Sequence, residues 1–265
     1  MRLFEPLNPP LPAWQDARVW VIGASYGIGA AVARALLSRG AHVALSARGA
    51  DKLRDVAGDP AAARGAALIE PLDFTDAAAV AAAWQRVQAA FRRVDLVLIV
   101  AGTHKEVRAW ELTDAESRAL LEVNLHGPIG TVATVVPGLL AQGRGAIGIV
   151  ASLAGYRGLP KALVYGASKA ALINFAETLY LDLRPRNLGV YLINPGFVKT
   201  PLTDRNEFRM PHLISAEDAA DEIIRGLERR EFEIHFPKAF SRQLGFLRHL
   251  PYRLYFAAVR RATGL

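Results

Sequence analysis

The sequence contains no cysteine among its 265 residues. Disulfide bonds, thiolate metal ligands and a thiol nucleophile are therefore excluded, and the composition fits a reducing compartment. The N-terminal segment has no apolar signal-like region, and no charge-free apolar stretch reaches the roughly 18 residues that a membrane-spanning helix needs. We therefore expect a cytoplasmic protein.

The chain also lacks the usual signs of a metal enzyme. Its six histidines form no pair at i and i+4, and none belongs to an HExxH sequence. These are the arrangements that place zinc ligands on one helix face. We therefore expect no metal site.

Acidic residues are missing from the end of the chain. Residues 237–265 hold six of the 32 basic side chains and none of the 25 acidic ones, so the net charge of +7 and the pI of 9.9 come mostly from this tail. The rest of the chain is nearly neutral, which is weak support for nucleic-acid binding. No nucleic-acid partner is expected.

Apolar residues at helical spacing follow Pro251 in this basic tail. Tyr252, Tyr255, Phe256 and Val259 recur at i, i+3, i+4 and i+7, which predicts an amphipathic helix with its arginines largely on other faces. This helix could pack on the body or on a second subunit. It could also make peripheral contact with an anionic membrane surface. Nucleic acid is the least favoured of its possible partners.

A strand, a glycine turn and a helix open the body of the chain. The apolar run Val19–Ile22 leads into Gly23-Ala-Ser-Tyr-Gly27-Ile-Gly29, and apolar residues then repeat at helical spacing as far as Gly40. Glycines at 23, 27 and 29 allow a tight turn and a close approach of backbone to a pyrophosphate at the helix N-terminus. A plain glycine-rich turn is the alternative.

The next apolar run, residues 42–47, bears on the choice of cofactor. A site for NAD usually has an acid at the end of this strand to hold the ribose hydroxyls, whereas the 2′-phosphate of NADP favours an arginine. Here the strand is followed by Arg48. We therefore expect NADP rather than NAD, unless Arg48 is only a surface residue that opens the next helix.

The remaining pattern alternates strands with helices. Further strands are expected at 66–73, 95–102, 146–151, 190–193 and 232–236, and helices at 75–93, 113–142, 165–184 and from 215 onward. This alternation predicts a single α/β domain of the doubly wound Rossmann type, with about seven parallel strands. We divide the chain into an irregular lead-in (1–17), this domain (18–236) and a basic extension (237–265).

A phenol and an ammonium lie one helical turn apart within 165–184. Tyr165 and Lys169 share a helix face at i and i+4, and Ser152 follows a strand thirteen residues upstream. A neighbouring cation favours the phenolate, and a serine hydroxyl can hold a carbonyl oxygen. Tyr165 could therefore donate a proton, Lys169 could lower the pKa of Tyr165, and Ser152 could hydrogen-bond a substrate carbonyl. Such a pair also occurs on surface helices, where the lysine is merely solvated.

In order and spacing these motifs resemble the short-chain dehydrogenase/reductase family over roughly residues 17–236. The shared features are the glycine turn, Ser152, the Tyr165/Lys169 pair and Asn-Pro-Gly at 194–196. Two positions depart from the family pattern. Ile22 stands before the first glycine where a threonine is usual, and Ile99-Val replaces Asn-Asn before Ala-Gly. Both lie beside the expected cofactor site.

The resemblance implies a role for each matching residue. Tyr165 is expected to be the general acid/base, Ser152 to polarise the substrate oxygen, and Lys169 to lower the tyrosine pKa and hold the nicotinamide ribose. Asn124 lies at a Gly-Pro fault in helix 113–142, where it either caps freed backbone groups or keeps a relay water in place. The candidate cofactor contacts, with Arg48 from the argument above, are Gly23, Ser25, Tyr26, Gly27, Ile28, Gly29, Arg48, Asp73, Ala101, Gly102, Tyr165, Lys169, Pro195, Gly196, Val198 and Thr200.

The implied activity is NADP(H)-dependent interconversion of a carbonyl and an alcohol. An irregular apolar segment at 201–214 suits a flap over an apolar pocket, so we expect a small apolar substrate. Candidate wall residues are His104, Tyr156, Leu159, Phe197 and Leu202. Two alternatives remain: a catalytically silent NADP(H) sensor, and an enone double-bond reductase of the same superfamily. A homodimer or homotetramer is expected.

Overall fold

Seven strands form one parallel sheet in the computed structural model, which describes residues 5–58, 65–203 and 210–264. The strands are β1 (Arg18–Ile22), β2 (His42–Ser46), β3 (Ala67–Ile69), β4 (Leu96–Ile99), β5 (Gly145–Val150), β6 (Leu188–Pro195) and β7 (Glu233–Phe236). They are ordered β3-β2-β1-β4-β5-β6-β7, and every neighbouring pair is parallel. The single doubly wound domain predicted from the alternating pattern is therefore confirmed.

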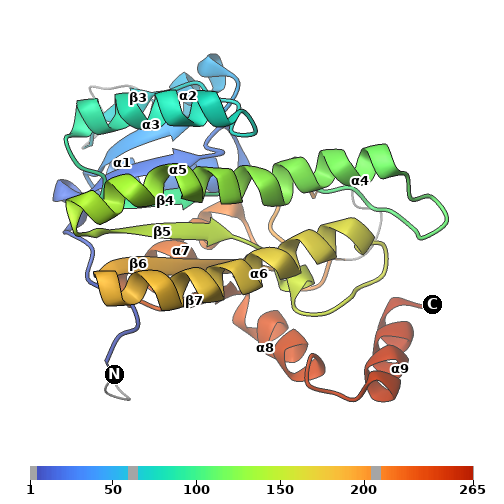
Figure 1. Ribbon diagram of the computed structural model, residues 1–265. Helices are drawn as coiled ribbons and strands as arrows, with labels where there is room; N and C mark the ends of the chain where they lie inside the picture. The colour runs from blue at the N-terminus through green and yellow to red at the C-terminus, as the bar shows by residue number, and fades with distance from the viewer. Residues whose placement is uncertain (1–4, 59–64, 204–209, 265) are drawn as a thin grey trace.

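Helices cover both faces of the sheet (Figure 1). They are α1 (Gly27–Ser38), α2 (Ala50–Ala57), α3 (Ala77–Phe91), α4 (Asp114–Leu121), α5 (Gly127–Gln142), α6 (Leu163–Leu183), α7 (Ala216–Glu228), α8 (Lys238–Leu247) and α9 (Tyr252–Thr263). Alternate residues of β1 serve opposite layers, because successive side chains of a strand point to opposite faces. Val19 and Val21 join the core under α1, α2 and α7, whereas Trp20 and Ile22 join the core under α3, α5 and α6.

β3 is shorter than the strand expected at 66–73. Only residues 67–69 pair with β2. Farther along, Glu70 forms an ion pair with Arg86 of α3, and Asp73 closes a turn by accepting hydrogen bonds from the backbone and side chain of Thr75. The backbone nitrogens of Glu70 and Leu72 still donate to Leu45 and Ala47, so the chain follows β2 almost to the predicted carboxylate although only 67–69 form the strand.

The helix expected at 113–142 is continuous but changes its hydrogen-bond pattern. A π-helical segment, Glu122–His126, joins α4 to α5 at the predicted fault. Asp114–Gln142 consequently is long and apolar enough, by length and composition, to span a membrane, which departs from our expectation. One face of it packs in the core through Val132, Val135 and Leu139, and 39% of its apolar window is buried.

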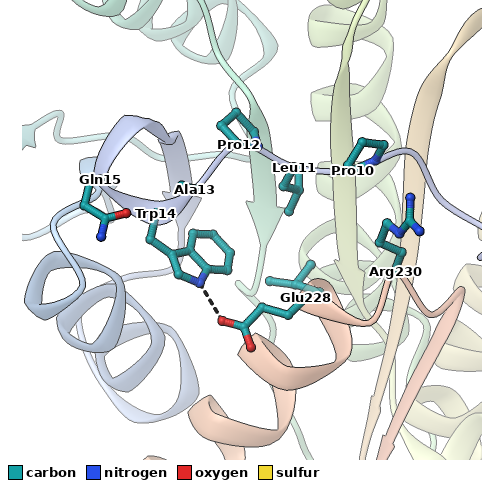
Figure 2. A pocket seen from close by; sticks show the side chains of 9 residues that line it. Pro10, Leu11, Pro12, Ala13, Trp14, Gln15, Glu228 and Arg230 are labelled. Atoms are coloured by element: carbon teal, nitrogen blue, oxygen red, sulfur yellow. Dashed lines mark hydrogen bonds between the residues drawn. The ribbon is translucent and has the colours of Figure 1, made fainter.

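The lead-in is more ordered than the proline pattern suggested. Asn8 is buried, and its side chain pairs with the backbone of Val190 in both directions. Trp14 donates a hydrogen bond of 2.7 Å to Glu228 of α7 (Figure 2). A cavity of about 380 Å³ lies here, lined by Pro10, Leu11, Pro12, Ala13, Trp14, Gln15, Leu227, Glu228 and Arg230.

This cavity lies beside the segments that enter β1 and β7, and so at the amino ends of the strands. In doubly wound sheets ligands bind outside the carboxyl ends, at the point where the strand order reverses. The cavity is therefore a feature of the lead-in and belongs to the opposite edge from the predicted site.

The C-terminal extension contains two helices, α8 and α9, where the sequence pattern predicted one. Arg157 holds the turn between them by donating to the carbonyl oxygens of Leu247, Arg248 and Leu250 at 3.2, 3.0 and 2.6 Å. Tyr255 of α9 is buried. The missed helix, α8, has no side-chain cap at its N-terminus, so the usual sequence signal for a helix start is absent.

Candidate active site

Ser152 and most of the predicted cofactor contacts lie at or just after the carboxyl ends of six neighbouring strands, β1 to β6, whereas Asn124, Tyr165 and Lys169 lie on helical segments. Because the strands are parallel, those ends share one edge of the sheet. The order reverses between β1 and β4, and the turns after these two strands touch: a Cβ added at Gly23 would lie 2.5 Å from the backbone nitrogen of Ala101. Ile22 links the two turns. It directly precedes Gly23, and its carbonyl oxygen accepts hydrogen bonds from the backbone nitrogens of Val100 and Ala101.

The glycine turn has the geometry that a dinucleotide needs. Gly23 has φ +94°, and its backbone nitrogen donates to the carbonyl oxygen of Ser46 at the end of β2. A Cβ at Gly29 would lie 2.1 Å from the carbonyl oxygen of Gly23, so neither position accepts a side chain. α1 begins at Gly27, so its unpaired backbone N–H groups face the turn, as a pyrophosphate requires. These residues fit a bound NAD(P).

Other predicted contacts surround this turn. Thr200 lies against Gly27, since a Cβ there would be 2.9 Å from Thr200 Cγ2. Tyr26 is half exposed, and the ammonium of Lys52 lies 5.8 Å from its ring centroid. Ser25 and Ile28 are half-buried, whereas Val198 is buried.

The adenine end carries one exposed cation and one carboxylate. Arg48 is exposed at the end of β2, where no acid is present. Hydrogen bonds from the Thr75 side chain and backbone hold the pKa of Asp73 below its usual value, and the nearby charge of Arg48 adds to this effect. Arg48 and Asp73 therefore lie within electrostatic reach of each other.

Ser152 is held where β5 ends beside β6. Its hydroxyl accepts a hydrogen bond from Ala154 at 3.1 Å and donates to the carbonyl oxygen of Pro195 at 3.4 Å. Leu153–Gly155 form a short 3₁₀ turn that begins at this serine. The structure thus places Ser152 next to the Pro195-Gly196 segment that the resemblance assigned to the nicotinamide side.

Tyr165 and Lys169 lie on α6 with very different surroundings. Part of Tyr165 reaches solvent, but dense protein around the ring raises the pKa of its hydroxyl by desolvation, against which a hydrogen bond with Ser152 acts. Lys169 is buried and donates to the carbonyl oxygen of Val150 at 3.0 Å. Burial lowers the pKa of Lys169 to about 8. Its ammonium lies 5.9 Å from the centroid of the Tyr165 ring.

The electrostatics differ from the sequence expectation in one respect. Desolvation is the largest influence on Tyr165 and acts against the phenolate, whereas we expected the ammonium to dominate. The physical reason is that both groups are withdrawn from water, and burial disfavours the charged form of each. Tyr165 is therefore a weaker acid here than a free phenol, and Lys169 is not among the groups that shift its pKa.

Asn124 anchors the turn after β4. Its side chain accepts from the backbone nitrogen of Thr103 and donates to the carbonyl oxygen of the same residue, each at 2.8 Å. A Cβ added at Gly102 would lie 3.4 Å from both Asn124 Oδ1 and Lys169 Nζ. The π-helical segment, the β4 turn and the lysine of α6 therefore converge at one point.

His104 lies directly beside the candidate acid. Its ring meets that of Tyr165 edge to face, with centroids 4.6 Å apart. Desolvation lowers the pKa of His104, against a smaller effect of Glu106. The structure thus places His104, one of the five wall residues expected from the sequence, in contact with Tyr165.

Two other expected wall residues face the C-terminal extension. Tyr156 donates a 2.5 Å hydrogen bond to Glu233, and Arg248 covers its ring at 5.1 Å. Leu159 lines a small space with Tyr156, Tyr255 and Leu244 of α8. These contacts engage both residues with the tail rather than with an open substrate space, because the missed helix α8 occupies this side.

The loop after β6 is closed at its base. Lys199 donates a backbone hydrogen bond to Ile214, and Ile214 donates one to Phe197, so the two ends of the loop lie side by side. Leu202 is half-buried within it. The expected flap at 201–214 falls partly outside the described residues, which exclude 204–209. Phe197 stacks on Phe240 of α8, a residue that sequence reasoning missed.

A doubly wound sheet, a glycine turn at its switch point and a Ser-Tyr-Lys group at the same edge together define the dinucleotide-dependent oxidoreductase class. The sequence model of the short chain dehydrogenase family matches residues 17–209. The chain belongs to the short-chain dehydrogenase/reductase family and is an oxidoreductase of that family.

Relatives and solved structures agree with this assignment. The chain is 36% identical over 243 residues to an uncharacterized oxidoreductase of Myxococcus xanthus, covering 91% of this chain and 95% of the relative. It is 34% identical over 190 residues to a 2-dehydro-3-deoxy-L-rhamnonate dehydrogenase (NAD(+)) of Sphingomonas sp., covering 70% and 73%. A short chain dehydrogenase of Burkholderia cenocepacia in complex with NADP superposes with a TM-score of 0.79 at 27% identity, covering 96% and 99%.

Proposed function

We propose that the protein interconverts a carbonyl and an alcohol on a small apolar molecule, with NADP(H) as redox partner. The observation that carries this proposal is the meeting of Ser152, Tyr165 and Lys169 at the edge of the sheet where the glycine turn lies. A serine hydroxyl, a phenol and an ammonium are the groups that a carbonyl reduction needs around the developing oxyanion.

The chemistry divides between nucleotide and protein. The reduced nicotinamide, when bound, supplies the hydride that becomes the new C–H bond of the alcohol. Ser152 donates a hydrogen bond to the carbonyl oxygen, and Tyr165 gives that oxygen its proton as negative charge develops. Lys169 stabilises the resulting phenolate until solvent returns a proton. General acid catalysis of this kind contributes about 10² to 10⁴ in rate. In the direction of oxidation the same residues act in reverse.

The preference for NADP over NAD is part of this proposal. Arg48 supplies the only described charged side chain at residues 46–49, after β2, and it is exposed there. A guanidinium can pair with a 2′-phosphate, whereas the acid that would favour the 2′-hydroxyl of NAD is missing. One relative is named for NAD and one structural neighbour holds NADP, so the family accommodates both.

One assay separates this function from its two alternatives. The purified protein is mixed with NADPH and a panel of apolar aldehydes, ketones and enones, and NADPH oxidation and product structure are followed. An alcohol product supports the proposal. A saturated ketone from an enone indicates a double-bond reductase, and NADPH binding without oxidation of any compound indicates the sensor.

We further propose a cytoplasmic protein that touches anionic membranes through its tail. Phe246, Tyr252 and Phe256 are 69%, 70% and 55% exposed, and the tail around them carries only basic charge. Aromatic side chains beside arginines suit an anionic lipid surface. Co-sedimentation with vesicles containing phosphatidylserine should fall for the double variant Arg253→Glu/Arg261→Glu. Equal sedimentation of the variant and the wild type would remove this proposal.

A homodimer or homotetramer is the proposed assembly. Leu140 of α5 and Leu163 and Leu181 of α6 are 41%, 45% and 71% exposed. Exposed leucines on neighbouring helices suit burial against a second copy of the chain. Light scattering after size exclusion measures the mass, and a monomer at micromolar concentration would contradict this proposal.

A further inference from the structure

An aromatic cluster lies beside the candidate active site, and one of its members comes from the C-terminal extension. The ring of Phe240 in α8 stacks on Phe197, with centroids 5.5 Å apart and planes at 28°. The ring of His212, from the segment before α7, has its centroid 6.1 Å from that of Phe240. Phe197 and Phe240 are half-buried and His212 is exposed. Part of the ring surface of the cluster therefore remains exposed.

The cluster is in contact with the backbone that holds Ser152. A Cβ added at Gly196 would lie 3.0 Å from the ring of Phe240 and 3.2 Å from the side chain of Leu153. Gly196 follows Pro195, whose carbonyl oxygen accepts the hydroxyl of Ser152. Phe240 thus packs against the backbone segment that accepts the hydroxyl of the proposed carbonyl anchor. The rings lie at the nicotinamide end of the proposed site.

The position of Phe240 is fixed by its neighbours. The next residue, Ser241, is buried, and its hydroxyl makes a 2.6 Å hydrogen bond with His235 of β7. The same hydroxyl donates to the carbonyl oxygen of Lys238 at 3.1 Å. At the other end of α8, Arg157 binds the last carbonyl oxygens. A helix tied at both ends presents a rigid wall.

We propose that Phe240 forms, together with Phe197 and His212, the apolar wall of the substrate site, and that this wall selects aromatic carbonyl compounds. The inference rests on the proposed function. It assigns specificity to a helix outside residues 17–209, the part matched by the family. Stacked rings favour a flat apolar group, because offset and edge-to-face ring contacts add to the burial of apolar area.

The matched substrates are acetophenone and acetone, two methyl ketones that differ by a phenyl group in place of a methyl group. The test variant is Phe240→Ala, and the control is Phe246→Ala on the same helix, whose ring is 69% exposed. With NADPH, we expect Phe240→Ala to lower the acetophenone-to-acetone ratio of kcat/KM about tenfold, the effect of one or two lost methylene-sized contacts in a pocket. The control should keep the ratio.

The same experiment can overturn the inference. An equal loss for both ketones in Phe240→Ala, or a ratio equal to that of Phe246→Ala, contradicts a wall that contacts the phenyl group. If Phe240→Ala has a lowered melting temperature, Phe240→Leu replaces it and must lower the ratio at least about threefold, because leucine keeps apolar volume but loses ring stacking. NADPH affinity should be unchanged in each variant.

A binding measurement separates this inference from the proposed function. If the wild type oxidises NADPH with neither these ketones nor any other compound of the panel, the proposed function fails, and acetophenone is titrated by calorimetry into the NADPH-bound protein. Binding about tenfold weaker in Phe240→Ala than in Phe246→Ala supports the wall, on the magnitude of such apolar contacts. Equal binding, or no binding to the wild type, overturns the wall.

Discussion

Replacing Lys169 by methionine should stabilise the protein at neutral pH while it removes activity. Burial lowers the pKa of this lysine from 10.5 to about 8. A tenfold change in a proton equilibrium is worth about 1.4 kcal/mol, so the folded state disfavours the ammonium by about 3 kcal/mol. Methionine removes this cost. It also removes the hydrogen bond to Val150, which offsets about 1.5 kcal/mol of the gain.

The sign of this effect depends on pH in a defined window. Below the folded-state pKa near 8, Lys169 is charged in both the folded and unfolded states, so the full cost is present. As pH rises from about 8 to 10.5 the folded protein loses the proton first, the unfolded state binds more protons, and the wild type gains stability. The advantage of Lys169→Met should therefore be about 1–2 kcal/mol at pH 7 and, because the loss of the hydrogen bond remains, should turn into a disadvantage of about 1 kcal/mol near pH 10.5.

Urea unfolding of the nucleotide-free protein at pH 7 and pH 10.5 measures this difference. The control is Lys199→Met, at an exposed position, which should change the free energy of unfolding by less than about 0.5 kcal/mol at both values. A pH-independent difference between wild type and Lys169→Met would refute the reasoning. The reasoning would also be refuted if the stability of Lys169→Met minus that of the wild type were lower at pH 7 than at pH 10.5.

Three further predictions concern the cofactor site and the tail. Arg48→Ala should weaken NADPH about tenfold or more while NADH is unchanged, because only the 2′-phosphate loses a charged partner; equal affinities of variant and wild type in fluorescence titrations would contradict this. Gly29→Ala should abolish nucleotide binding, because its Cβ would lie 2.1 Å from a carbonyl oxygen, whereas Gly49→Ala, with no atom within 4 Å, should bind normally in the same titration. Arg157→Met should release the turn between α8 and α9 and raise amide exchange around Tyr255, and unchanged exchange would show that the clamp is dispensable.

Local pattern predicted the sheet because its central strands are largely continuous apolar runs, whereas β7 (Glu-Ile-His-Phe) alternates. Trp20 and Val21 show the reason: a strand covered on both faces needs no polar alternation, so the run itself is the signal. The sequence predicted the glycine turn equally well, because Gly23 and Gly29 occupy places where any side chain would collide with backbone. Spacing alone identifies such positions.

Contacts between distant segments could not be predicted in this way. Phe240 meets Phe197 across 43 positions of sequence, and the helix that carries it has no cap to announce its start. Tyr156 was expected to face a substrate but donates a hydrogen bond to Glu233. The position of Glu233 depends on the pairing of β7 with β6. The direction of the pKa shift of Tyr165 also depends on packing density, which the spacing of Tyr165 and Lys169 does not reveal.

The most direct test of the account is the rate of NADPH oxidation by Tyr165→Phe in the presence of an apolar ketone that the wild type reduces. The substitution removes one hydroxyl and keeps the ring packed against His104. The account predicts a rate at least about 10²-fold lower, with NADPH affinity within about twofold of wild type. A Tyr165→Phe protein that reduces the ketone at the wild-type rate would contradict the assignment of the phenol as proton donor.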